Sequence, residues 1–135
     1  MSKEDYVSLE VAKLLKEKGF NEYYGAYYHL NWDDMNEEEC FEVAPNHDFR
    51  NKDNGYRAGA PTLYEAAKFL RKKGIFIEII PHYSNKYDVI EYGYRIATYF
   101  DLLEKSSKCR KSKEYYLKYE QCLNDAILES LKNMI

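Results

Sequence analysis

The chain has 135 residues, of which 45% are hydrophobic and 32% charged, and its formal net charge is −3. This composition excludes wholesale disorder and predicts one domain, residues 1–135, that buries a core without metal or disulfide staples. Because no apolar run approaches the roughly 20 residues of a membrane span, and because the charged first residues lack the apolar segment of a secretory signal, we expect a cytoplasmic protein.

The cysteines and tyrosines add two compositional observations. Cys40, Cys109 and Cys122 are odd in number, widely spaced and without a CxxC pair, which favours reduced thiols in the cytosol. The 15 tyrosines make the chain tyrosine-rich. Such richness is typical of interaction surfaces, because the ring is apolar and its tip is polar. We favour the simpler explanation, the codon bias of an AT-rich genome, since Lys, Asn and Ile are also plentiful.

The first third of the chain predicts a helix followed by a hairpin. Apolar residues recur at helical spacing over residues 8–18, with Ser8 as the N-cap and Gly19 as a left-handed stop. Residues 22–30 are rich in aromatic side chains, which favour a strand. After a turn, residues 38–44 are predicted to return as a second strand.

A polar loop and a well-marked helix follow. Residues 45–59 lack apolar periodicity and predict a surface loop of about fifteen residues, a length at which loops are usually functional or disordered. Thr62 and Glu65 then have the spacing of a capping box, and Gly74 ends the helix that they begin.

The remaining segments predict a second hairpin and a long final helix. Residues 75–80 are β-branched at nearly every position, as in a central buried strand that Pro81 closes. Residues 90–100 alternate with period two and predict the antiparallel partner. Residues 101–113 are polar, and apolar residues recur at helical spacing over residues 112–133.

These elements predict an α+β fold, in which helices pack on one face of a mainly antiparallel sheet in the order α-β-β-loop-α-β-β-α. Residues 11–20 align without gaps with residues 66–75, and two predicted strands follow each. The echo suggests a duplicated α-β-β unit. Two unrelated capped helices that end in Lys-Gly and an apolar residue would also look alike, so both explanations stay open.

The sequence contains no catalytic or cofactor signature. His29, His47 and His82 have no metal-ligand spacing, and we expect no cofactor and no metal. The nearest approach to a reactive loop is a site within residues 45–60, where His47 lies near Arg50 and Arg57. It is one hypothesis for a small enzyme or an enzyme inhibitor. An ordinary polar loop is the simpler explanation.

A second hypothesis is nucleic-acid binding. Strand tyrosines can stack on bases, and a basic segment at residues 105–113 can contact phosphates. The alternative is that the tyrosines belong to the core and the basic segment is a solvated linker. The residues of this candidate interface are Tyr92, Tyr94, Lys108, Arg110, Lys111 and Lys113.

The order of segments also resembles a protein family. The matching stretches are residues 7–20, 60–66, 69–71, 73–75, 94–96 and 126–132. On these stretches the chain resembles small proteins of Bacteroides-type gut bacteria and of their phages and prophage-like elements. The chain departs from the pattern at residues 107–120. The family has no established activity, so the resemblance implies a mobile-element context and no reaction.

We therefore expect a non-enzymatic, cytoplasmic protein that binds another protein, an accessory protein of a phage or mobile element. We also consider a homodimer, formed through a strand edge or the C-terminal helix, because exposed strand edges pair readily with other strands. We expect no interaction with a membrane.

Overall fold

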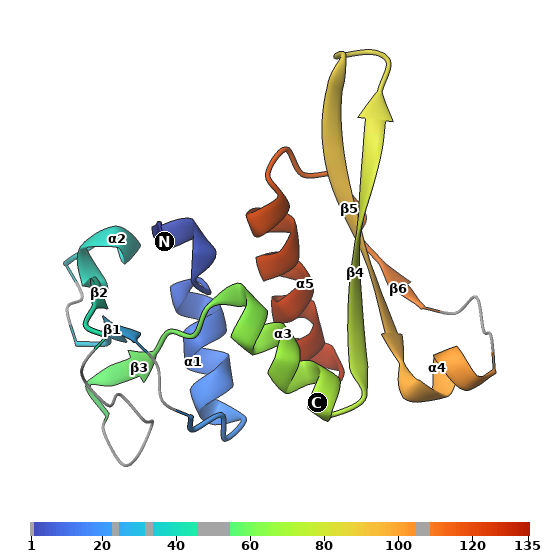
Figure 1. Ribbon diagram of the computed structural model, residues 1–135. Helices are drawn as coiled ribbons and strands as arrows, with labels where there is room; N and C mark the ends of the chain where they lie inside the picture. The colour runs from blue at the N-terminus through green and yellow to red at the C-terminus, as the bar shows by residue number, and fades with distance from the viewer. Residues whose placement is uncertain (1, 23–24, 32–33, 46–54, 105–108) are drawn as a thin grey trace.

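The computed structural model describes residues 2–22, 25–31, 34–45, 55–104 and 109–135. Its described strands form two antiparallel three-stranded sheets, with helices packed between them (Figure 1), which confirms the predicted α+β class. The elements are η1 (Lys3–Asp5), α1 (Leu9–Glu17), β1 (Ala26–His29), α2 (Glu37–Cys40), β2 (Phe41–Val43), β3 (Arg57–Gly59), α3 (Leu63–Lys72), β4 (Ile75–Ser84), β5 (Val89–Thr98), α4 (Tyr99–Leu103), β6 (Arg110–Lys111) and α5 (Tyr119–Asn133).

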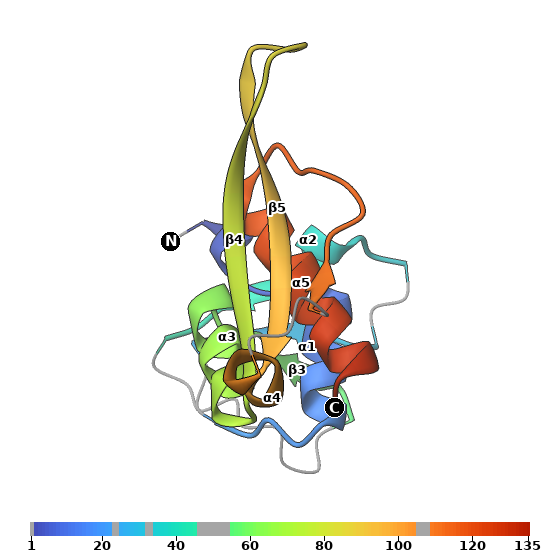
Figure 2. The ribbon, with the colours of Figure 1, turned by 90° about the vertical axis from the view of Figure 1, so that its right-hand side faces the viewer.

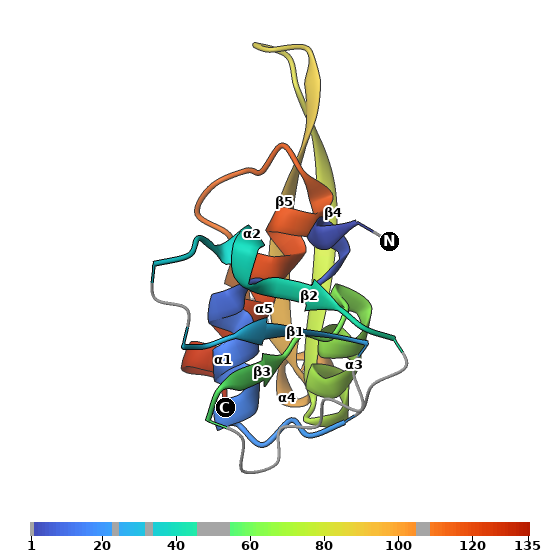
Figure 3. The same ribbon diagram turned by 90° about the vertical axis from the view of Figure 1, so that its left-hand side faces the viewer.

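The first sheet has the strand order β2-β1-β3 (Figure 3) and corrects two expectations. Residues 38–40 belong to the short helix α2 and not to a strand, because the Asn36 side chain accepts a hydrogen bond from the Glu39 N–H and caps the helix. The predicted loop 45–59 ends in β3, which pairs with β1. Residues 46–54 of that loop lie outside the described residues.

The two predicted helix starts and stops are confirmed. The Ser8 hydroxyl accepts from the Val11 N–H at the start of α1, and Thr62 and Glu65 form a reciprocal capping box at the start of α3. The φ angles of Gly19 and Gly74 are +83° and +81°, a left-handed conformation that side chains other than hydrogen disfavour.

The second sheet has the strand order β4-β5-β6, and β4 is an edge strand that runs past Pro81, not a buried central strand that ends there. Tyr92, which lies opposite Pro81, exchanges both backbone hydrogen bonds with Tyr116 on its other side. The pair of Pro81 and Tyr92 is therefore not hydrogen-bonded, and the missing proline N–H falls on the free edge, where it costs no ladder bond. The far end of the hairpin projects beyond the rest of the protein (Figure 2).

The elements after β5 also differ from the prediction. A capping box between Thr98 and Asp101 turns the chain into the short helix α4. Helix α5 begins at Tyr119, seven residues later than expected from 112, because residues 110–111 pair with β5 as β6 and Tyr116 bridges to Tyr92. Pairing with the outer edge of β5 replaces the first two turns of the expected helix.

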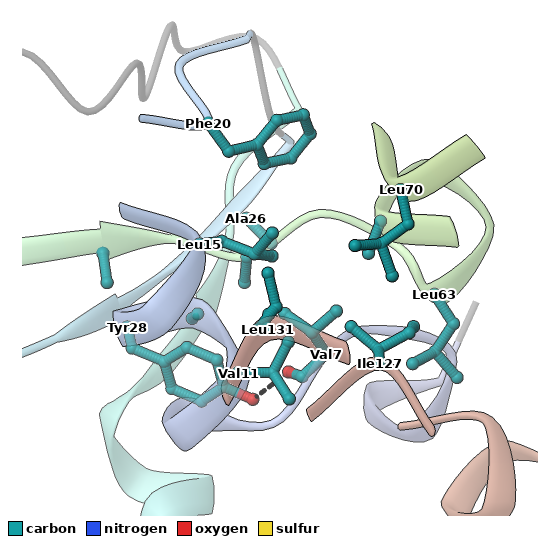
Figure 4. Close-up of a cluster of buried hydrophobic side chains, with 14 of the residues drawn as sticks. Val7, Val11, Leu15, Phe20, Ala26, Tyr28, Leu63, Leu70, Ile127 and Leu131 are labelled. Carbon is teal, nitrogen blue, oxygen red and sulfur yellow. Dashed lines mark hydrogen bonds between the residues drawn. The ribbon is translucent and has the colours of Figure 1, made fainter. Parts of the chain in front are cut away.

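The core lies between the sheets, around α5 (Figure 4). Ile127 and Leu131 of α5 are fully buried, and α5 contacts α1, α3, β4 and β5. Among these apolar side chains the Tyr28 hydroxyl donates to the Val7 carbonyl at 2.6 Å, which satisfies the one polar atom of its ring.

The duplication hypothesis required α1 and α3 to occupy equivalent positions on one sheet. The strands that follow them lie in two separate sheets, so the echo between residues 11–20 and 66–75 does not extend to a common sheet. None of the helices in the described part of the chain has the length and apolar character needed to cross a bilayer.

Candidate functional site

A groove of about 620 Å³ opens where α3, β4 and the start of α5 meet. Helix α3 begins after Thr62, which bridges to Tyr6, and it ends at Lys72. Gly74 then leads directly into β4. The residues that line the groove are Asp5, Thr62, Leu63, Tyr64, Ala67, Arg71, Ile77, Ile79, Tyr119, Glu120 and Leu123.

The floor of the groove is apolar and is contributed by three elements. Ala67 of α3, Ile77 and Ile79 of β4 and Leu123 of α5 are each partly exposed there. Ala67 leaves room because its side chain is a single methyl group. Tyr64 forms part of the rim and is 68% exposed, so a large ring stands beside the groove without being buried by the fold.

The groove carries charges of both signs. Arg71 lies in the last turn of α3, next to the start of β4, and its guanidinium is 5.7 Å from the centre of the Tyr64 ring. Glu120 lies at the other end, because its neighbour Tyr119 contacts Tyr92, which pairs with Pro81. Asp5 lies at the start of α3, because the next residue, Tyr6, bridges to Thr62. The groove is therefore anionic at the end near Pro81, and its cation, Arg71, lies on the α3 side with the guanidinium reaching back toward Tyr64.

The tyrosines of the nucleic-acid hypothesis point toward the start of α5. The ring of Tyr92 meets Tyr119 edge to face, with centroids 5.7 Å apart. The ring of Tyr94 lies 6.4 Å from Tyr116, and burial, with the charge of Glu129 as a smaller cause, raises the pKa of Tyr94. Each ring thus has a neighbour within the protein.

The basic residues of the same hypothesis are spread over β6 and the segment after it. The Arg110 guanidinium donates to the Glu129 carboxylate at 2.8 Å, whereas Lys111 and Lys113 are exposed. Lys108 lies outside the described residues. The structure therefore brings Lys111 and Lys113 together with Tyr94 at a second pocket of about 350 Å³, whereas the rings of Tyr92 and Tyr94 contact Tyr119 and Tyr116.

Of the three residues of the predicted loop site, only Arg57 lies in the part of the chain that the structure describes. His47 and Arg50 lie outside the described residues, and Arg57 lies on β3 with its guanidinium 4.8 Å from the centre of the Tyr27 ring. The outer face of this first sheet holds a polar cluster of Tyr27, His29, Glu42 and Arg57.

Glu42 is the acceptor at the centre of that polar cluster. The Tyr27 hydroxyl donates to Glu42 Oε2 at 2.5 Å, and His29 Nε2 lies 2.9 Å from the same oxygen. These two hydrogen bonds hold the pKa of Glu42 below its ordinary value, while burial, followed by the bond to Glu42, raises the pKa of Tyr27. Sequence reasoning missed this cluster, although the spacing of two between Tyr27 and His29 places them on one face of a strand.

The outer face of the second sheet presents further exposed apolar side chains. The His82 and Tyr115 rings stack 4.4 Å apart beside Gly93, whose missing Cβ would lie 3.1 Å from Ser112 Oγ. Helix α4 leaves four large apolar residues exposed, Tyr99, Phe100, Leu102 and Leu103.

Sequence reasoning also missed the groove itself, because it predicted that residues 75–80 form a central buried strand. One signal was available. The apolar residues of α3 are Leu63, Ala66, Ala67, Phe69 and Leu70, a face broad enough to serve the core and a second surface.

Within the described ranges no group of three His, Cys, Asp or Glu residues could hold a metal ion. No protein-family model, no curated protein and no solved structure matches the chain.

Proposed function

We propose that the protein is a non-enzymatic interaction protein, which holds an apolar segment of a protein partner in the groove between α3, β4 and α5. The observation that carries this proposal is the groove itself, a mainly apolar concavity of about 620 Å³ whose charged lining residues are Asp5, Arg71 and Glu120. A concave apolar surface with a few placed polar groups is the usual form of a binding site.

The chemistry of the lining supports binding more than catalysis. The described lining residues include no histidine and no cysteine, and the carboxylates of Asp5 and Glu120 lie at one end, away from Arg71. Asp5 is already engaged, because its carboxylate accepts from the Ser2 N–H at 2.9 Å. Tyr64 and Tyr119 line the groove and are exposed, and tyrosine is a residue type that often carries much of the binding energy at protein interfaces.

The proposed cellular setting is the cytoplasm, in a phage or mobile-element context. The three cysteines are free, which suits a reducing compartment. The mobile-element part of the proposal rests on the family resemblance of the sequence alone.

The proposal is tested by selecting binders from a displayed library of random 12-residue peptides. The affinity of a selected peptide is then measured by fluorescence anisotropy for the wild type and two variants. Ala67→Trp fills the floor of the groove, whereas Lys68→Trp places the same ring at the next, exposed position of α3. Circular dichroism and the melting temperature check that both variants fold.

We expect Ala67→Trp to weaken peptide binding at least tenfold and Lys68→Trp to leave it within about threefold, since a tenfold loss needs only about 1.4 kcal/mol. A selection that yields no specific peptide, or peptides that bind both variants equally well, contradicts the proposed function.

A further inference from the structure

The backbone groups on the free edge of β4 point outward in the plane of the sheet. Along an antiparallel strand, successive residues direct their N–H and C=O groups to opposite sides. The Tyr99 N–H donates to the Gly74 carbonyl, and the backbone of Tyr92, opposite Pro81, bonds to Tyr116 instead of to β4. Counting between these two points, residues 76, 78 and 80 face β5, and residues 75, 77 and 79 face the free edge.

In the described part of the chain, β4 pairs with β5 alone. Ile75, Ile77 and Ile79 therefore present N–H and C=O groups at an edge that no described strand occupies. The usual devices that blunt an edge are charges and prolines. Between residues 75 and 80 the strand has only Glu78, whose carboxylate is 2.8 Å from the Arg95 guanidinium on β5.

Helix α3 supplies the second half of the arrangement. Tyr64, Ala67 and Arg71 lie along one side of this helix, at spacings of three and four, and all three line the groove beside β4. In Figure 2 α3 extends past the edge of β4, so that a strand added to β4 would lie over α3.

We infer that a segment of the partner protein adds to β4 as a fourth, antiparallel strand whose apolar side chains alternate into the groove over Ala67. This inference rests on the proposed function and names the chemistry of the partner. Main-chain hydrogen bonds supply affinity in this binding mode, and the pockets for alternate side chains supply specificity.

The structure sets the length and polarity of the segment. We expect the partner segment to pair with β4 from Ile75 to Pro81, because Pro81 has no N–H to offer at the free edge. The segment then contributes about six residues. A strand antiparallel to β4 starts beside Asp5 and Glu120 and then passes Arg71 on the α3 side. A cationic residue at its start and an anionic residue further along complement these charges.

The test is an N-methyl scan of a peptide selected from the 12-residue library, with each backbone N–H replaced in turn. Positions whose N–H faces β4 lose a hydrogen bond, whereas the positions between them face away. We expect about tenfold weaker binding at every second position over about six residues and changes within about threefold at the others. Exchanging the cationic and anionic residues of the peptide is expected to weaken binding further.

The outcomes separate this inference from the proposed function. A peptide that loses affinity for Ala67→Trp but shows no alternation in the scan overturns strand addition and leaves groove binding intact. An empty selection overturns both. Concentration-dependent dimerisation in sedimentation, abolished by Ile77→Pro, would show that a second copy of the chain occupies the edge, and it also overturns the inference.

Discussion

Ile127→Ala removes a side chain that lies where all the layers of the fold meet. Ile127 is fully buried on α5, the helix that contacts α1 on one side and α3 with β4 and β5 on the other. The substitution deletes three carbon atoms, worth about 2.4 kcal/mol at about 0.8 kcal/mol each. The cavity left behind raises the expected loss in the free energy of unfolding to about 3–4 kcal/mol.

The assay is guanidinium unfolding followed by far-ultraviolet circular dichroism, with amide exchange in β1 and β5 as separate reporters of the two sheets. Both sheets pack on the same helix, so we expect one transition that shifts as a unit, as required of a single domain over residues 1–135. Ile127→Val is the matched control, with an expected loss of about 1 kcal/mol. A loss below about 1 kcal/mol for Ile127→Ala, or two separate transitions, refutes this reasoning.

Three further predictions concern the Glu37 carboxylate, the backbone of Gly74 and nucleic-acid binding. Glu37 accepts from the Leu9 N–H at 2.8 Å and from the Lys3 ammonium at 2.6 Å, and its pKa is lowered because these contacts outweigh the opposing effect of burial. A lowered pKa stabilises the fold above the unfolded value and loses that effect as pH falls through the folded value. Glu37→Gln should therefore cost about 1 kcal/mol at pH 7, discounted for a half-exposed side chain. The cost should shrink as pH falls through the lowered pKa of Glu37, whereas a pH-independent cost contradicts the assignment. Gly74→Ala should cost about 1–2 kcal/mol in thermal unfolding because of its φ of +81°, and equal effects of Gly74→Ala and Gly55→Ala would contradict the strain argument. We expect micromolar protein to show no salt-dependent binding of labelled single-stranded or duplex oligonucleotides, and binding that weakens with salt and is lost in Lys111→Glu would instead support the nucleic-acid hypothesis.

The two capped helices could be predicted from sequence because their signals are local. The capping box of Thr62 and Glu65 and the left-handed Gly74 act within a few residues of the turns that they fix. The class of the fold followed from such signals. The Ser8 cap was predicted in the same way, but its partner was not. Asn124 Nδ2 donates to the Ser8 hydroxyl across 116 residues of sequence, and no local pattern indicates that contact.

The errors arose where distant pairing decided the structure. Strand β3 looks like loop because Arg57, Ala58 and Gly59 have no strand periodicity, and its identity comes from pairing with β1. Tyr116 has helical spacing in the sequence, but its backbone bonds to Tyr92. In each case a partner far along the chain overrode the local preference.

The groove could not be predicted for the same reason. Ile77 and Ile79 are typical of a central buried strand, and their sequence does not reveal that β4 lies at an edge. Exposure of these isoleucines depends on which strands the rest of the chain provides. Only the topology shows that β4, whose composition is typical of a buried strand, has a free edge.

Amide hydrogen exchange along β4, measured by NMR with and without a selected peptide, shows whether a partner strand adds to the free edge of β4. The N–H groups of Ile77 and Ile79 face the free edge, and those of Phe76 and Glu78 face β5, so neighbours in one strand serve as internal controls. We predict that the peptide slows exchange at Ile77 and Ile79 at least tenfold and leaves Phe76 and Glu78 nearly unchanged. Equal protection of all four amides, or none at Ile77 and Ile79 when the peptide is bound, contradicts the addition of a partner strand to β4.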